Sequence, residues 1–464
     1  MIPLTLAKVL EITSGKLVCA NDKSVLAKVI NKVSTDTRTV NQGDLFVALV
    51  GERFDAHDFI ENASAASALI VEREVNTTVP QIVVKNTLKA LGLLGREVKR
   101  LADVKTVAIT GSCGKTTVKE LLAAICVQAG KTHATGGNFN NEIGVPLTLL
   151  GLEQSDEYAV IELGANHIGE IAYTVGLTEP DVAMVNNVAG AHLEGFGSLQ
   201  GVAQAKGEIY GGLTESGTAV VNLDCEFIHS WQSRLDKLQM MAFSMDSSVA
   251  DVTAENIELN VDANGASQFE LNIKGEVLPV KLNLSGQHNI ANALAATTCA
   301  LALGLTNEQI VKGLEAVDSV KGRLDRIQVK ANLLAIDDSY NANEASMKAA
   351  LDVLAQEKGH KIFVMGDMGE LAEYAFDAHA AVGQYARKLG IDEIYTLGSL
   401  SLHAQSEHED DKHFSEFEEL MHSLNARLET LTEQPVCLLV KGSRSAKMER
   451  VVTALQAQQG VSSC

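Results

Sequence analysis

The chain has 464 residues, of which 46% are hydrophobic and 21% charged, a composition typical of a soluble globular protein with about three domains. Its formal net charge of −21 argues against a general nucleic-acid binder, and no apolar run approaches the ~20 residues that span a bilayer. The seven cysteines form no Cys-x-x-Cys pair, and residues 1–16 carry no signal-peptide pattern, so we expect a cytoplasmic monomer without disulfides or structural zinc.

Three blocks divide the predicted elements. Residues 1–85 show short strands and turns, whereas residues 86–315 contain a helix, a strand, a glycine-rich loop, further apolar strands and an alternating hairpin. Residues 316–464 alternate apolar strands with helical lengths, which favours a parallel sheet with helices on both faces. We therefore predict an α/β fold of three domains, with a central P-loop parallel-sheet domain like that of ATPases and a Rossmann-like C-terminal domain. Strands are expected at 106–109, 158–161, 182–185, 333–336, 362–365, 393–397 and 437–440, and the hairpin at 269–284.

A glycine-rich loop lies between the strand 106–109 and the amphipathic helix that follows it. Its glycines allow backbone N–H groups to converge on an anion, and the helix N-terminus adds a positive dipole. Lys115 is placed to reach the β- and γ-phosphates of ATP, and the Thr116 hydroxyl can ligate Mg²⁺. Ile109 stands where the common phosphate loop has its first glycine, so this is a shorter form of the loop. The predicted ATP-binding residues here are Gly111, Ser112, Cys113, Gly114, Lys115, Thr116 and Thr117.

Three further side chains are candidates for chemistry near the carboxyl ends of the central strands. Glu162 ends the apolar strand 158–161, a position that faces the ligand crevice of an open α/β sheet and suits a Mg²⁺ ligand. An exposed glutamate at a strand end is the alternative. His192 follows the strand 182–185, where a structural histidine is equally compatible with the pattern. Lys206 alone reads as a surface helix lysine.

Polar residues also follow the later elements. The amides of Asn289 and Asn292 near a helix start can cap the helix or read a base edge. Asp338 ends an apolar strand of the third block. Lys441 and Arg444 flank Gly-Ser directly after another strand, which suits a small carboxylate, although two solvated cations would look the same in sequence.

Taken together, these segments resemble the Mur ligase family across essentially the whole chain. The signatures are the loop 110–117, the asparagine-rich stretch 137–146 and the helix start 286–292. Within that family, 338–343, 365–368 and 441–444 look like the member that adds D-alanyl-D-alanine to a UDP-N-acetylmuramoyl-tripeptide. The resemblance implies an ATP-dependent amide ligase of peptidoglycan precursor synthesis that acts through an acyl phosphate.

The resemblance also implies roles that spacing alone does not give. Glu162 and His192 would ligate Mg²⁺, and Lys206 would be carbamylated by CO₂ and supply a carboxylate to a second Mg²⁺, so these residues and Lys115 form the expected catalytic set. Asn292 would read adenine, and Arg323 and Asp338 would touch phosphate and ribose from the C-terminal domain. The expected substrate residues are Thr35, Asp36, Thr37 and Arg38 for the UDP end, Asn138, Asn140 and Asn141 for the muramoyl peptide, and Lys441, Ser443 and Arg444 for D-alanyl-D-alanine.

Three alternatives remain. A sister ligase that adds the third amino acid would be expected to carry an Asp-Asn-Pro-Arg or Tyr-Ala-His-Thr-Pro segment, and neither occurs. A folylpolyglutamate synthetase would share the glycine loop but lack the UDP-binding first block. A non-enzymatic nucleotide switch would have no use for Glu162, His192 and Lys206 together. The sequence does not decide whether the third peptide residue is meso-diaminopimelate or lysine.

Overall fold

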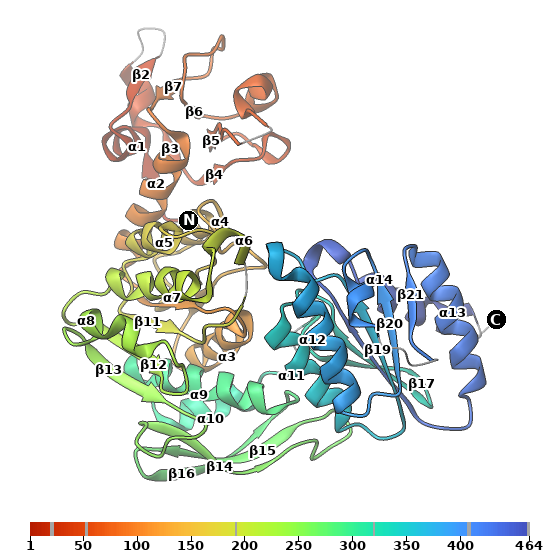
Figure 1. Cartoon of the computed structure of the whole chain (residues 1–464). Helices are drawn as coiled ribbons and strands as arrows, with labels where there is room; N and C mark the ends of the chain where they lie inside the picture. Colours follow the sequence, from red (N-terminus) through yellow and green to blue (C-terminus); the bar gives the residue numbers. More distant parts are fainter. Residues whose placement is uncertain (19–22, 52–53, 191–192, 319–320, 406–409, 462–464) are drawn as a thin grey trace.

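The computed structural model describes residues 1–18, 23–51, 54–190, 193–318, 321–405 and 410–461. Figure 1 shows three parts: the N-terminal part, in red and orange, lies above the central part, and the C-terminal part, in blue, lies beside the central one. Within the described residues the strands form sheets of two, five, nine and six strands. No helix among these residues is both long and apolar enough to cross a membrane.

The N-terminal part is built on a small, mostly parallel sheet. Its order is β2-β7-β6-β5-β4, with β4 to β7 parallel and β2 antiparallel at one edge. A separate antiparallel pair joins β1 and β3. The elements are β1 Leu4–Thr5, α1 Leu6–Thr13, β2 Lys16–Val18, η1 Lys23–Ala27, β3 Val29–Ile30, β4 Lys32–Ser34, η2 Thr37–Thr39, β5 Asp44–Val47, η3 Ala56–Ala63, β6 Ala68–Val71 and β7 Gln81–Val83.

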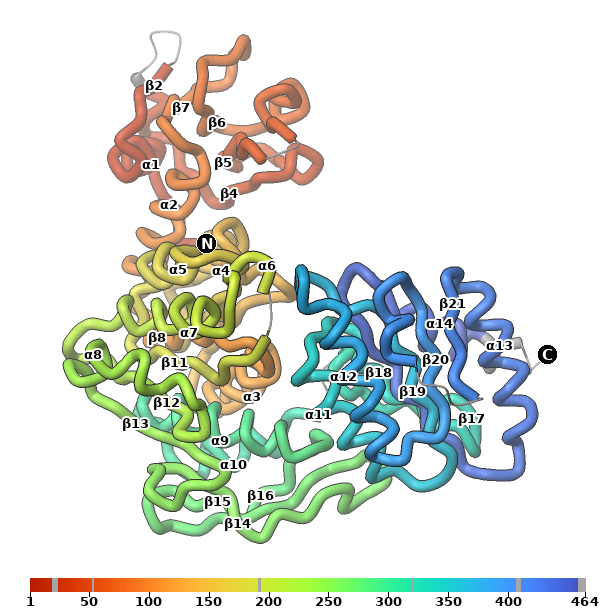
Figure 2. The backbone as a smooth tube through the Cα atoms, in the orientation of Figure 1, coloured from red at the N-terminus to blue at the C-terminus, as the bar shows by residue number. Residues whose placement is uncertain are grey.

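Helix α2 (Thr87–Ala102) carries the chain from the N-terminal part into the central part, as the trace in Figure 2 shows. Asn86 caps it by accepting a hydrogen bond from the N–H of Lys89 at 2.7 Å. Its buried face, which includes Leu91 and Leu94, belongs to one continuous apolar core with residues of both parts. This shared core ties the small N-terminal sheet to the central sheet.

The central part holds a nine-stranded sheet in the order β16-β15-β14-β13-β12-β11-β8-β10-β9. The strands from β9 to β13 are parallel, and β14 to β16 form an antiparallel meander that includes the predicted hairpin. The strands are β8 Lys105–Thr110, β9 Thr132–Ala134, β10 Tyr158–Glu162, β11 Val182–Val185, β12 Thr218–Asn222, β13 Gln239–Phe243, β14 Val252–Glu258, β15 Ser267–Ile273 and β16 Glu276–Leu282.

Helices cover both faces of the central sheet, because alternate residues of its inner strands are buried on opposite sides. Ala108 and Ile161 pack into the core shared with α2, α4, α5 and α7, whereas Val107 and Val160 pack into a second core with α3, α9 and α10. The helices are α3 Lys115–Val127, α4 Gly144–Leu150, α5 Glu170–Thr178, α6 Leu193–Phe196, α7 Leu199–Gly207, η4 Glu208–Gly212, η5 Ile228–Trp231, α8 Gln232–Leu235, α9 Gln287–Ala302 and α10 Asn307–Glu315.

The C-terminal part is a six-stranded sheet in the order β17-β18-β22-β19-β20-β21, parallel except for β17. Helices α11 and α12 pack on one face, and α13 and α14 on the other. The elements are β17 Asp325–Lys330, β18 Leu333–Asp338, α11 Glu344–Ala355, β19 His360–Gly366, η6 Ala372–Tyr374, α12 Ala375–Lys388, β20 Glu393–Leu397, η7 Ser401–Ala404, β21 Lys412–Phe414, α13 Phe417–Thr430, β22 Val436–Lys441, η8 Arg444–Ala446 and α14 Glu449–Val461.

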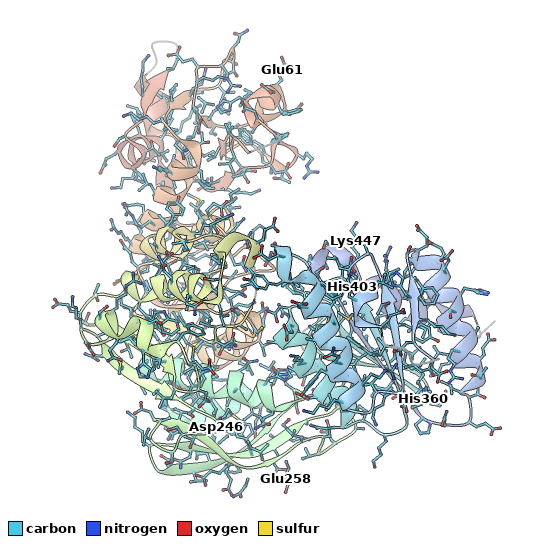
Figure 3. All side chains as sticks on the ribbon, in the orientation of Figure 1. Glu61, Asp246, Glu258, His360, His403 and Lys447 are labelled. Atoms are coloured by element: carbon cyan, nitrogen blue, oxygen red, sulfur yellow. The ribbon has the colours of Figure 1, made fainter. Side chains whose placement is uncertain are left out.

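The predicted α/β class with parallel sheets is confirmed. Figure 3 shows His360, where β19 begins, and Lys447, which follows β22, at opposite ends of the C-terminal sheet. The carboxyl ends of its strands therefore lie at the Lys447 end. In open α/β sheets that edge is where ligands bind.

Candidate functional site

A cavity of about 1070 Å³ lies where the central part meets the C-terminal part. Its walls come from loops that follow parallel strands of both sheets and from parts of the helices α3, α9 and α11, as expected for a ligand site in this fold. None of the described residues before Ser112 lines it, so Thr35 to Arg38 lie elsewhere. The predicted residues that it does bring together are Ser112, Cys113, Gly114, Lys115, Thr116, Thr117, Asn138, Asn140, Asn141, Glu162, Asn292, Arg323, Asp338, Lys441, Ser443 and Arg444.

The glycine-rich loop joins β8 to α3 and leaves the start of that helix without a side-chain cap. Gly114 occupies the N-cap position with a left-handed backbone, φ 77°. The Lys115 ammonium donates to the carbonyl oxygen of Gly111 at 2.7 Å, so the lysine folds over its own loop. Burial lowers the pKa of Lys115. An anion at the helix N-terminus would find free N–H groups and a cation within reach.

Glu162 is the last residue of β10 and lies beside this loop. Its two carboxylate oxygens accept hydrogen bonds from the Thr116 hydroxyl at 3.0 Å and from the Asn140 amide at 2.8 Å. Its backbone N–H donates to the Thr135 hydroxyl at 3.0 Å, which fixes the end of the strand. A carboxylate beside a hydroxyl fits a Mg²⁺ ion next to phosphates, because this metal prefers oxygen ligands.

The remaining predicted metal ligands differ in what the structure describes. His192 lies outside the described residues. Among the described residues no group of three or more His, Cys, Asp or Glu side chains could hold a metal ion. The Thr116 hydroxyl and a carbamylated lysine are oxygen ligands of other kinds, so the set predicted from the resemblance stays a prediction.

Lys206 is not a surface lysine. It lies near the end of α7, is only 1% exposed, and its ammonium is 5.4 Å from the centre of the Phe196 ring. Burial, helped by the positive charge of Lys115, lowers the pKa of Lys206 to about 7. Near neutral pH, Lys206 is therefore the neutral amine in a large fraction of the protein molecules, and that form can react with CO₂.

The C-terminal part closes the cavity with Arg323. Its guanidinium donates to the Thr116 hydroxyl at 3.3 Å and lies 4.4 Å from the centre of the Tyr340 ring. The buried Nε of Arg323 has no hydrogen-bond partner among the described residues. A cation held over the phosphate loop with an unsatisfied donor fits an anionic ligand between the two parts.

Asp338 and Lys441 form a buried pair at the ends of the adjacent strands β18 and β22. The Lys441 ammonium donates to the Asp338 carboxylate and to the carbonyl oxygen of Asn341, the latter at 2.9 Å. The other Asp338 oxygen accepts from the N–H of Leu324 at 3.2 Å. Lys441 is thus already neutralised. The Arg444 guanidinium donates from one Nη to the Glu449 carboxylate at 3.2 Å, but its side chain is 66% exposed, so its remaining N–H groups can reach a ligand carboxylate.

The predicted asparagines are held by one another and by the backbone. Asn292 is 5% exposed; its amide oxygen accepts from Asn186, and its NH₂ donates to Asn289, both at 3.0 Å. Asn140 donates to Asn138 at 3.1 Å, while the Asn141 side chain accepts from the N–H of Gly144 at 2.8 Å, where α4 begins. Asn141 therefore fixes the turn that leads into α4 and also lies in the cavity wall.

The predicted UDP-binding residues lie at the carboxyl end of β4 in the N-terminal part. Asp36 caps η2. Its carboxylate also accepts hydrogen bonds from the Arg38 guanidinium, from Nε at 2.9 Å and from Nη2 at 2.7 Å. This guanidinium lowers the pKa of Asp36 to about 2. The Arg38 side chain is 85% exposed, and one edge of its guanidinium is used by Asp36.

Sequence reasoning missed several residues of the cavity. Tyr340 lies within the segment 338–343 and was given no role, yet Arg323 stacks on its ring. The Asn343 amide contacts the Cys113 sulfur at 3.1 Å, which links the C-terminal part to the phosphate loop. Gly369 and Glu370, after β19, also line the cavity. Their position after a parallel strand was the signal that could have identified them.

A glycine-to-alanine change at position 114 tests the loop geometry. An added Cβ would lie 2.4 Å from the amide oxygen of Asn292, and the left-handed backbone disfavours alanine. We expect G114A to lower the free energy of unfolding by at least about 1–2 kcal/mol, measured by urea denaturation, and to weaken ADP binding. G176A is the matched control, because its added Cβ has nothing within 4 Å; a G114A chain as stable as this control would contradict the geometry.

The fold and the cavity define an α/β protein whose phosphate loop, in a central domain, is completed by cations from a second sheet domain. Three family models match the chain: "Mur ligase family, catalytic domain" over residues 29–103, "Mur ligase middle domain" over 109–300, and "Mur ligase, glutamate ligase domain" over 322–444. The chain belongs to the Mur ligase family.

Individual relatives match over nearly the full length. The UDP-N-acetylmuramoyl-tripeptide–D-alanyl-D-alanine ligase of Escherichia coli (strain K12) is 46% identical over 98% of this chain and 99% of its own length. The crystal structure of MurF from Acinetobacter baumannii superposes with a TM-score of 0.92 at 39% identity, covering 98% of this chain and 99% of that one. The MurF ligase of Thermotoga maritima in complex with ADP gives a TM-score of 0.82 at 28% identity, covering 93% and 98%.

Proposed function

We propose that the chain is an ATP-dependent ligase that joins D-alanyl-D-alanine to UDP-N-acetylmuramoyl-tripeptide. The observation that carries this proposal is the cavity in which Arg323 from one domain meets Thr116 and Glu162 of the phosphate-loop domain. It offers both a phosphate site and room for a second and third substrate. The full-length similarity to D-alanyl-D-alanine ligases supports the choice of substrates over the sister-ligase, folylpolyglutamate and switch alternatives.

The proposed domain roles follow the three blocks. Residues 1–85 bind the UDP end of the sugar nucleotide through the segment from Thr35 to Arg38. Residues 86–315 bind ATP, and residues 316–464 complete the ATP site and bind D-alanyl-D-alanine. The exposed Arg444 pairs with the dipeptide carboxylate, because a guanidinium can hold a carboxylate by two parallel hydrogen bonds.

The reaction proceeds in two covalent steps. A carboxylate oxygen of the tripeptide attacks the γ-phosphorus of ATP, and the bond to the β-phosphate oxygen breaks to release ADP. The amine of D-alanyl-D-alanine then attacks the carbonyl carbon of the acyl phosphate, loses a proton, and expels inorganic phosphate as the amide forms. Lys115, Arg323 and the helix N-terminus neutralise the crowded phosphate oxygens, so the protein contributes mainly placement and charge.

Mg²⁺ fits the oxygen ligands beside the loop. Thr116 and Glu162 would hold one ion, and His192, which lies outside the described residues, is the further ligand that the resemblance predicts. Lys206, once carbamylated, supplies a carboxylate to a second ion; its burial and its pKa of about 7 favour the neutral amine that forms a carbamate. When bound, the metal supplies charge stabilisation of the transferring phosphoryl group.

Release of phosphate tests the assignment. The purified chain, supplied with ATP, Mg²⁺ and the tripeptide nucleotide, should release phosphate at a sustained rate only when D-alanyl-D-alanine is also present. Parallel reactions with the lysine and meso-diaminopimelate nucleotides will identify the accepted third residue. Sustained release that ignores D-alanyl-D-alanine would contradict the proposed ligase.

A further inference from the structure

The phosphate loop is fastened to the segment that follows β11 by a set of six hydrogen bonds. Ser112 contributes three: its N–H donates to the carbonyl of Asn187 at 3.1 Å, and its hydroxyl both donates to the carbonyl and accepts from the N–H of Ala189 at 2.9 Å. Cys113 takes part in the others. Its N–H donates to the side-chain oxygen of Asn187 at 2.8 Å, and its carbonyl accepts from the amides of Asn186 at 3.0 Å and Asn187 at 3.1 Å.

The two asparagines are themselves fixed. Asn186 is 3% exposed, its N–H donates to Thr110 at 2.8 Å, and its carbonyl accepts from Asn222 at 2.9 Å. Asn187 makes two hydrogen bonds to the backbone of one residue. Its side-chain oxygen accepts from the N–H of Cys113, and its NH₂ group donates to the carbonyl of Cys113. An amide side chain supplies an acceptor oxygen and a donor NH₂ from one planar group, so it can serve both partners at once.

Because the peptide bond is planar, these hydrogen bonds to Cys113 also orient the N–H of Gly114. In a trans peptide the C=O of Cys113 and the N–H of Gly114 point in opposite directions. Because the carbonyl is held toward the asparagines, the N–H of Gly114 points away from them. That N–H has no acceptor among the described residues, and Gly114 lines the cavity.

We propose that Asn187, with Asn186 beside it, is a positioning residue that aims the N–H of Gly114 at the phosphates of the nucleotide. The N–H of Cys113 takes no part in phosphate binding, because Asn187 already occupies it. The phosphate donors of this loop are therefore the N–H groups of Gly114 and of the first turn of α3, together with Lys115. This inference rests on the proposed ATP site and adds the residue that shapes it.

The test is the dissociation constant for Mg·ADP, measured by titration calorimetry on the full chain. N187D keeps an acceptor for the N–H of Cys113 but sets a carboxylate oxygen against its carbonyl, and N187A removes both partners. We expect both variants to bind Mg·ADP about 10- to 100-fold more weakly than the wild type, with Asp no better than Ala. The KM for D-alanyl-D-alanine should change less than twofold, because the loop does not hold the dipeptide.

The matched control is N332A. Asn332 likewise donates its amide to two backbone carbonyls, those of Leu431 and Gln434, but lies away from the cavity. A melting temperature in the Asn187 variants no lower than that of N332A shows that weaker binding is not general unfolding. Wild-type affinity in either Asn187 variant, or recovery of affinity by Asp alone, would overturn the inference. A wild-type chain that binds no Mg·ADP would overturn the proposed function as well.

Discussion

Replacing Lys115 with methionine is expected to lower kcat/KM for ligation by about 10²- to 10³-fold or more. Methionine keeps most of the apolar stem but removes the ammonium that now lies 2.7 Å from the carbonyl oxygen of Gly111. When phosphates enter the loop, the Lys115 ammonium can give up its hydrogen bond to the Gly111 carbonyl and donate to the phosphate oxygens instead. Loss of a preorganised cation at the point where charge is transferred is costly in a buried site. Initial rates of phosphate release with all substrates present give the measurement.

The control for this variant is K312M, which changes an exposed lysine on α10. It should retain the wild-type rate and melting temperature. K115M should match both proteins in melting temperature, since Lys115 makes no hydrogen bond to the rest of the fold outside its own loop among the described residues. A K115M chain that ligates at near-normal rate would refute the role of the glycine-rich loop.

Removing the amine of Lys206 is the second change that we expect to lower the ligation rate strongly. We expect K206A to lose at least about 10²-fold in rate, and added formate or acetate to restore part of the activity, because a small carboxylate can replace the missing carbamate. K206R keeps the positive charge but cannot form a comparable carbamate, so it should remain inactive. These three rates, measured side by side, separate a carboxylate role from a cationic one.

The wild-type chain offers an independent test of the same residue. Removal of dissolved CO₂ should inactivate it slowly, and added CO₂ should restore activity. Because the pKa of Lys206 is about 7, the neutral amine grows as pH rises through that value. At equal CO₂, reactivation should therefore be faster above pH 7 than below it. An active K206R variant, or activity that is indifferent to CO₂, would exclude the carbamate.

Much of the fold was predictable because its strands are buried on both faces. Continuous apolar runs such as 158–161 and 437–440, separated by helical lengths, predicted parallel strands, and the structure places them in β10 and β22. The alternating residues over 269–284 likewise predicted the hairpin of β15 and β16. The edge strands β17 and β21 were not predicted, since an edge strand needs less apolar sequence and is defined by its neighbour.

The loop end of the candidate site was also predictable, because strand, glycines, lysine and helix are adjacent in sequence. Contacts across domains were not. The stacking of Arg323 on Tyr340, its hydrogen bond to Thr116 and the buried state of Lys206 depend on how distant segments pack. The spacing around Lys206 suggested a surface residue, and only tertiary burial explains its lowered pKa.

The role of Asn187 was not predicted from the sequence. Asn187 follows the apolar strand β11, but its hydrogen bonds to Cys113 require the loop from β8 to lie beside it. That neighbour relation follows from the pairing of β11 with β8, which is a long-range contact. Side-chain hydrogen bonds of this kind can be predicted only when the register of the parallel strands is known.

The most direct test of the whole account follows the oxygen atoms of the tripeptide carboxylate. With both carboxylate oxygens labelled as oxygen-18, the acyl-phosphate route transfers one of them to inorganic phosphate and leaves the other in the new amide. Mass spectrometry should therefore find singly labelled phosphate in equal amount to the UDP-N-acetylmuramoyl-pentapeptide. Unlabelled phosphate, or phosphate formed without the pentapeptide product, would contradict the account.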